Sequence, residues 1–158
     1  YGVFCPLFRL HGVREPKPED VQGGTGADNE IWSFGDENYP VLRKLIETRE
    51  RMRPYIMDQM KLASEKGTPP MRPLFFDYPD DETLYTIEDE FLFGPDIVAA
   101  PVIYPGAAER TVYLPKDAVW YDAWTGKKAE SGVWFTAKAP LDTIPVYLRE
   151  GAKVKLAE

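Results

Sequence analysis

Apolar residues recur at steps of three, four and six positions between residues 38 and 66, which places them on one face of an α-helix. The residues of this face are Leu42, Leu45, Ile46, Met52, Ile56, Met60 and Ala63. Charged residues fill the positions between them and are interpreted as a solvated flank with paired neighbours. We expect the helix to begin at Asn38 or Tyr39, to kink at Pro54 and to end at Gly67.

From residue 71 onward the pattern changes to short runs rich in β-branched and aromatic residues. Gly, Pro and Asp separate these runs at fairly even spacing, which is typical of an antiparallel β-sandwich. The segment 124–128 predicts a hairpin turn in which Gly126 takes a positive φ. The change of pattern near residues 67–72 predicts a domain boundary. The predicted strands are 74–78, 90–93, 97–103, 110–114, 119–124, 133–137 and 144–148.

The first eleven residues are densely apolar, and residues 7–10 resemble a short buried strand bounded by Pro and Gly. A single strand needs neighbours for its backbone hydrogen bonds, and the rest of the chain does not obviously supply them. Residues 12–36 then show no regular apolar pattern. A loop of this length in a compact domain is usually functional or disordered.

Composition excludes several classes of function. The 158 residues contain 44% hydrophobic residues, enough for a packed core, and carry a net charge of −7 without a basic stripe, which argues against a nucleic-acid partner. No apolar stretch reaches the roughly 20 residues that cross a bilayer. Cys5 is the only cysteine, so it excludes a multi-cysteine zinc site and is expected to be a buried, inert thiol. The acidic segments 80–82 and 88–90 predict turn residues and a solvated or arginine-paired edge rather than a cation site.

Chemistry, if the chain carries any, is expected near His11, the only histidine, and Arg9. On the residues alone, a lone histidine beside a glycine is more often structural than a ligand. The sandwich aromatics, Trp120, Tyr121, Trp124 and Trp134, suggest a sugar-stacking surface, but alternating aromatics in strands are more often core residues or cross-strand pairs.

An ordered series of short motifs resembles the C-terminal part of family 31 glycoside hydrolases, the α-glucosidases and α-xylosidases. It covers essentially the whole chain, and the ordered set is more specific than any one motif. The motifs lie at residues 4–12 (FCPLFRLHG), 42–45 (LRKL), 53–55 (RPY), 71–74 (MRPL), 79–81 (PDD), 91–97 (FLFGPDI), 100–102 (APV), 112–115 (VYLP), 120–126 (WYDAWTG) and 144–152 (IPVYLREGA).

The resemblance implies an α+β fragment: the last strand and helix of a (β/α)8 barrel followed by an antiparallel β-sandwich. Residues 1–67 would then hold the end of the barrel, with residues 12–36 as a loop at the catalytic face, and residues 71–158 would form the sandwich. The family's two catalytic aspartates precede this region, and Asp28, Glu30 and Asp36 match neither of them. We therefore expect no glycosidase activity from these 158 residues alone.

By the same resemblance, His11 matches a histidine that contacts the sugar, and Arg9 matches an arginine two residues earlier that would hold a carboxylate. Alternation along a strand would place both on one face. The expected activity is hydrolysis of terminal α-glucosidic bonds, without a cofactor, with an α-linked oligosaccharide or glycoside as substrate and the remainder of the barrel as partner. The competing hypothesis is a non-catalytic carbohydrate-binding or structural sandwich module.

Overall fold

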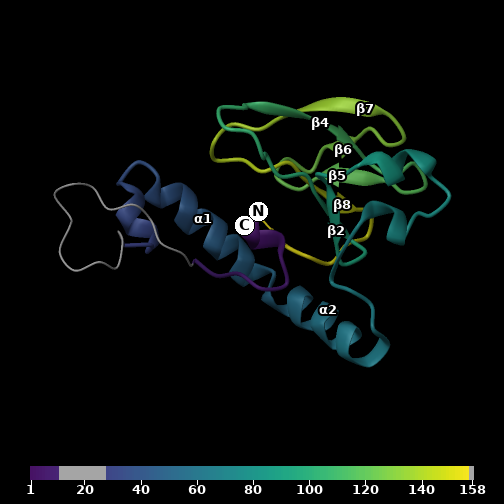
Figure 1. The fold of residues 1–158 in the computed structure, drawn as a ribbon, viewed down its shortest axis with the longest axis horizontal. Coiled ribbons are helices and arrows are strands. Elements are labelled where there is room, and N and C mark those ends of the chain that lie inside the picture. Colours follow the sequence, from purple (N-terminus) through teal and green to yellow (C-terminus); the bar gives the residue numbers. More distant parts are fainter. Residues whose placement is uncertain (11–27, 157–158) are drawn as a thin grey trace.

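The computed structural model describes residues 1–10 and 28–156, with two helices along one side of an antiparallel sandwich (Figure 1). Helix α1 (Tyr39–Arg51) and helix α2 (Arg53–Lys66) follow one another almost end to end. The described residues also include the short 3-10 helices η1 (Gly2–Phe4), η3 (Ile31–Phe34), η4 (Leu74–Phe76) and η5 (Glu82–Thr86).

The helical prediction is confirmed, including both of its ends. Asn38 precedes the first turn of α1, and its side-chain amide donates to the carbonyl of Phe34 at 2.9 Å. Pro54 has no N–H to donate to the preceding turn, and the helix divides at Met52, close to the predicted kink. Gly67 takes the left-handed conformation at φ 69°, and its N–H donates to the Ala63 carbonyl, which ends α2.

The predicted antiparallel sandwich is also confirmed. One sheet has six strands in the order β1-β2-β3-β8-β5-β6, the other consists of β4 and β7, and every described pair is antiparallel. Gly126 has φ 68° in the hairpin between β5 and β6, as its position predicted. The strands are β1 (Met71–Arg72), β2 (Phe91–Phe93), β3 (Ile97–Ala99), β4 (Glu109–Tyr113), β5 (Trp120–Asp122), β6 (Lys128–Ala129), β7 (Trp134–Lys138) and β8 (Val146–Arg149).

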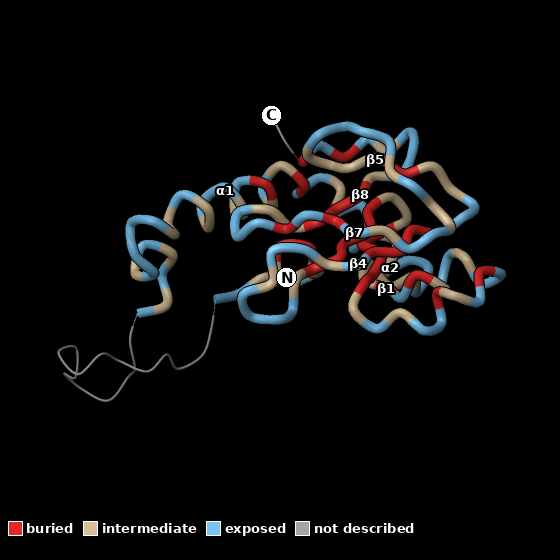
Figure 2. The backbone as a smooth tube through the Cα atoms, turned by 90° about the horizontal axis from the view of Figure 1, so that it is seen from above, coloured by how far each residue is buried: buried red, intermediate tan, exposed pale blue. Residues whose placement is uncertain are grey.

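The strands β2 and β3 are buried on both faces because a different layer covers each face. Phe91 and Phe93 pack with η1 and the helices, whereas Leu92 between them packs with the two-stranded sheet. This alternation follows from the two-residue period of a strand. Buried positions accordingly gather in the strands and on the inner side of the helices (Figure 2).

Two predicted strands do not form. Residues 74–76 make the 3-10 helix η4, since the guanidinium of Arg72 binds the carboxylate of Asp77 and lies 5.3 Å from the Phe76 ring, so the chain turns there. Residues 7–10 are irregular, and Leu7 is 83% exposed. No described strand lies beside residues 7–10, so their backbone has no ladder to join.

Candidate functional site

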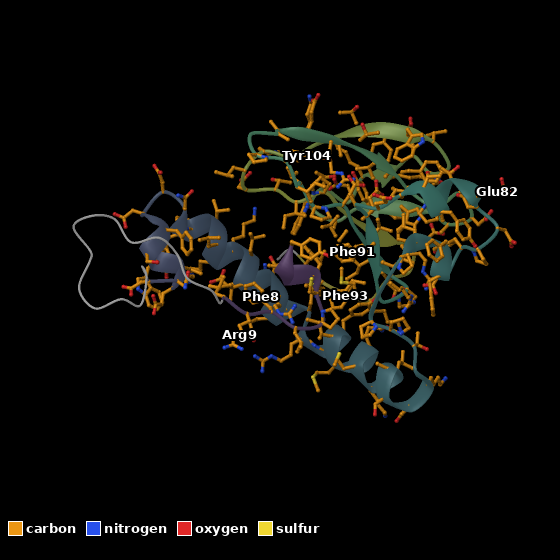
Figure 3. The ribbon with its side chains drawn as sticks, in the orientation of Figure 1. Phe8, Arg9, Glu82, Phe91, Phe93 and Tyr104 are labelled. Atoms are coloured by element: carbon orange, nitrogen blue, oxygen red, sulfur yellow. The ribbon has the colours of Figure 1, made fainter. Side chains whose placement is uncertain are left out.

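The two residues predicted to carry chemistry lie at the end of the N-terminal segment, here defined as residues 1–10, or directly after it. His11 lies outside the described residues. Arg9 is exposed, and Figure 3 shows its side chain at the outer edge of the molecule, away from the sandwich. Residues 7–10 are not a strand, and the placement of Arg9 and His11 on one face stays a prediction.

A single arginine of helix α1 holds the N-terminal segment. Nη1 of Arg49 donates to the carbonyl oxygens of Val3 at 2.8 Å and of Cys5 at 2.7 Å, and reaches that of Gly2 at 3.5 Å. Nη2 donates to the carbonyl of Pro6 at 3.0 Å. One planar guanidinium therefore fixes most of the backbone between residues 2 and 6.

The aromatic ring of Phe8 completes this arrangement. The guanidinium carbon of Arg49 lies 5.6 Å from the ring centroid, within the range of a cation–π contact. The same ring lies so close to Gly2 that a Cβ there would stand 2.8 Å from it. Partial burial lowers the pKa of Arg49, but an arginine stays charged at neutral pH. Residues 2–8 thus form a loop around the guanidinium of Arg49.

Apolar contacts anchor the same loop to both layers of the molecule. Val3 and Phe4 are buried in a cluster that includes Met52 and Ile56 of the helical region. The ring of Tyr1 lies 5.5 Å from that of Phe91 on strand β2. The position of the N-terminal segment is therefore set by its core contacts and by Arg49, not by strand pairing.

The role of Arg49 was not predicted from the sequence, in which this residue falls within the charged flank of the helix. A signal was present in the spacing. The apolar series steps by six residues from Ile46 to Met52, and Arg49 occupies the middle of that gap, on the same face. Thr48, beside it, is fully buried and donates to the Lys44 carbonyl at 2.9 Å.

No described contact joins the acidic side chains of the predicted catalytic-face loop into a carboxylate pair. Asp28, Glu30 and Asp36 are exposed. The hydroxyl of Ser33 in η3 donates to the backbone carbonyls of Asp28 and Glu30, at 2.8 and 2.7 Å, rather than to their side chains. Trp32, also in η3, is 66% exposed.

A cavity of about 550 Å³ lies between Tyr1 and the first strands of the sandwich, and Glu90 is among its lining residues. The Glu90 side chain is fully buried; its Oε1 accepts from the Tyr113 N–H at 3.1 Å and lies 3.3 Å from Arg110. Burial raises the pKa of Glu90 to about 8, despite the nearby Arg110. We interpret Glu90 as neutral below that pH because its Oε2 has no donor, while Arg110 pairs with the more exposed Asp89 at 2.9 Å.

The ion pair of Asp89 with Arg110 at 2.9 Å agrees with the second of the two alternatives predicted for residues 88–90, a solvated or an arginine-paired edge. Asp81, predicted to be a turn residue, directly follows the turn at residues 79–80; it is buried and accepts a hydrogen bond from the Tyr113 hydroxyl at 3.0 Å. Within residues 1–10 and 28–156, no group of three or more His, Cys, Asp or Glu residues is arranged to hold a metal ion. Over the same residues, no helix is long and apolar enough to span a membrane.

The remaining side chains singled out from the sequence have structural surroundings. Trp120 is fully buried, and Trp124 packs against the core beside the helices. Trp134 is 51% exposed and stands directly opposite Tyr113 as a cross-strand pair. Cys5 is only partly buried, although burial raises the pKa of its thiol and so disfavours the reactive thiolate.

Two family models match the chain in sequence order. The glycosyl hydrolases family 31 TIM-barrel domain matches residues 1–59, and the glycosyl hydrolase family 31 C-terminal domain matches residues 67–154. An alpha-xylosidase from Saccharolobus solfataricus is 38% identical over 99% of the chain, and alpha-glucosidase 2 from Bacillus thermoamyloliquefaciens is 36% identical over 99%. The crystal structure of a GH31 alpha-xylosidase from a soil metagenome, complexed with xylose, superposes with a TM-score of 0.89 and 48% identity over 99% of the chain.

The chain spans only a small part of these proteins. It covers 20% of the Saccharolobus alpha-xylosidase, 19% of the Bacillus alpha-glucosidase and 25% of the soil-metagenome alpha-xylosidase.

Proposed function

The chain belongs to glycosyl hydrolase family 31, and from this membership we propose that it supplies the end of the catalytic barrel and the following sandwich of a retaining α-glycosidase. The enzyme would hydrolyse terminal α-glucosidic bonds of oligosaccharides or glycosides. The observation that carries the proposal is the ordered match of the barrel model and the C-terminal-domain model along one chain. We divide the chain into residues 1–67, part of the barrel, and residues 71–158, the sandwich.

Within the enzyme, His11 would donate a hydrogen bond to a sugar hydroxyl, and Arg9 would hold a carboxylate of the barrel interior. The exposure of Arg9 among the described residues supports this role, because a group contributed by another part of the enzyme could reach its guanidinium. Hydrogen bonds to sugar hydroxyls can strengthen in the transition state, so His11 would contribute to kcat as well as to binding.

The chain alone is proposed to be inactive. A retaining glycosidase needs two carboxyl groups about 5 Å apart, and both would come from the remainder of the barrel. Exposed apolar side chains support a missing partner: Leu7 is 83% exposed and Met57 is 62% exposed. Packing against the remaining barrel would bury such surface.

The test compares the purified chain with the complete polypeptide that contains it, using p-nitrophenyl α-glucoside and α-xyloside, with the β-glucoside as control. We expect the complete enzyme to hydrolyse an α-glycoside and to release the α-anomer first, as seen by proton NMR, and the chain alone to be inert. Hydrolysis by the chain alone would contradict the assignment of both carboxylates to the rest of the barrel. A complete polypeptide inactive on every α-glycoside would contradict the proposed function.

The alternative of a non-catalytic carbohydrate-binding module has less support. Such a module stacks sugars on exposed aromatic rings, and here Trp120 is fully buried while Trp124 packs against the core.

A further inference from the structure

We propose that Arg49 is a positioning residue for the substrate site: it fixes the N-terminal segment, which carries Arg9 and continues directly into His11. This inference rests on the proposed function, because it assigns to Arg49 an effect on substrate turnover and not only on folding. Arg49 itself would touch neither the sugar nor the catalytic carboxylates.

Beside the core contacts of Val3 and Phe4, one side chain supplies hydrogen bonds to the backbone of residues 2–6. The guanidinium of Arg49 donates to carbonyl oxygens on both sides of the Cys5–Pro6 bond, at 2.7 and 3.0 Å, and Phe8 lies on its face. Beyond Phe8 the described contacts of the segment thin out: Arg9 and Leu10 are exposed. The contact of Phe8 with Arg49 is thus the last well-packed described contact of the segment before the chain reaches His11.

A guanidinium is chemically suited to this task, and an ammonium is not. Its two terminal nitrogens are held in one plane and present donors to carbonyls several residues apart, while its flat face accepts an aromatic ring. Lysine has three donors on a single nitrogen and a shorter reach, so it can meet only some of these carbonyls. Arg49→Lys therefore keeps the charge and loosens the loop.

Displacement of the segment would act on catalysis through the residues that follow it. A shift of about 1 Å in a substrate-contacting group can cost about 100-fold in rate even when the altered residue is remote. We expect Arg49→Lys to lower kcat/KM of the complete enzyme by about 10- to 100-fold, mainly through kcat.

Helix α1 offers a matched control two residues away. The guanidinium of Arg51 donates to the Leu156 carbonyl at 3.0 Å and to the Thr48 hydroxyl at 3.1 Å, so it also ties α1 to a distant backbone segment. Arg51→Lys removes the same kind of contact but leaves the N-terminal segment held. It should change thermal stability about as much as Arg49→Lys while leaving kcat/KM within about twofold of wild type.

The test is a double-mutant cycle in the complete enzyme, with kcat, KM and melting temperature measured for R49K, H11A and R49K/H11A, and R51K alongside. If Arg49 acts through the segment that leads to His11, R49K should lower kcat/KM much less in the H11A background than in wild type. Equal losses in both backgrounds, or a loss no larger than that of R51K, would overturn the positioning role.

The outcomes separate this inference from the proposed function. H11A with unchanged kcat/KM would refute the sugar contact itself, whatever R49K does. H11A with reduced kcat/KM and R49K at the level of R51K would refute only the positioning role. If R49K does not accumulate as folded enzyme, Phe8→Leu takes its place in the cycle, because it removes the ring on the guanidinium and leaves the hydrogen bonds of Arg49 intact.

Discussion

Gly94, in the turn between β2 and β3, is the residue at which adding a single methyl group is expected to destabilise the fold most. Its φ is 59°, and its N–H donates to the Pro70 carbonyl. A Cβ at this position would lie 2.1 Å from the hydroxyl oxygen of Tyr55 and 2.8 Å from Cδ of Gln59, both on helix α2. Gly94 therefore allows the helix and the sheet to approach each other closely.

The cost of Gly94→Ala has three sources. A left-handed backbone costs a residue with a Cβ about 1–2 kcal/mol. Relieving the overlap with Tyr55 and Gln59 costs about 1–3 kcal/mol, as overpacking generally does. If Tyr55 moves, its hydroxyl gives up the bond it donates to the Phe93 carbonyl at 3.0 Å and the bond it accepts from the Asp96 N–H at 3.2 Å, each worth about 1 kcal/mol. Together these contributions predict a destabilisation of about 4–7 kcal/mol.

The assay is urea unfolding of the chain followed by tryptophan fluorescence, with the free energy of unfolding extrapolated to water. Gly106→Ala is the control, since Gly106 has φ 77° but nothing within 4 Å of its would-be Cβ, so it reports the backbone cost alone. Tyr55→Phe removes the nearest clashing atom, and its combination with Gly94→Ala should be less harmful than the two separate losses added. A Gly94→Ala cost equal to that of Gly106→Ala would refute the close-approach argument.

Two further predictions concern buried side chains. Burial raises the pKa of Glu90 from its ordinary 4.5 to about 8, so the folded state binds this proton more tightly than the unfolded state, and stability is lost as pH rises between those values. Glu90→Gln should therefore leave the free energy of unfolding nearly unchanged at pH 5 and raise it by on the order of 3–5 kcal/mol at pH 9, as measured by urea unfolding. If the variant kept the wild-type pH dependence of this free energy, Glu90 would be excluded as the source of that dependence. Trp120→Phe should lower the free energy of unfolding by about 2–3 kcal/mol, because Trp120 is fully buried and its indole N–H donates to the Pro115 carbonyl at 3.2 Å. Trp134→Phe changes a half-exposed site and should lower it by about 0.5 kcal/mol or less in the same assay.

The helices and the sandwich could be predicted from the sequence because their signals are local. The helix ends depend on Pro54 and Gly67, whose effects on backbone geometry act within one turn. Residues 74–76 were misassigned for the opposite reason. Their apolar and aromatic composition favours a strand, but the ion pair of Arg72 with Asp77 turns the chain, and composition does not reveal which partners a side chain finds.

The candidate site depends even more on contacts between distant segments. Arg49 and the carbonyls it binds are more than 40 positions apart, so no local pattern could specify the contact. The six-residue gap in the apolar series around Arg49 indicated only that something other than solvent lay against that face. His11 and Arg9 were singled out from the sequence, but the roles assigned to them come from the resemblance to family 31 and stay predictions.

The core explains why residues 1–10 keep a defined position without strand pairing. Phe4 of the N-terminal segment, Met52 between the helices, and Phe93, Ile97 and Val146 of the sheet belong to one buried cluster. The residues matched by the barrel model thus share their apolar core with those matched by the C-terminal-domain model. Because hydrophobic stabilisation scales with the area removed from water, the sandwich supports the helices and the segment that Arg49 holds. A substitution deep in the sheet can therefore be expected to loosen the N-terminal segment, which makes the sandwich part of what positions the proposed substrate site.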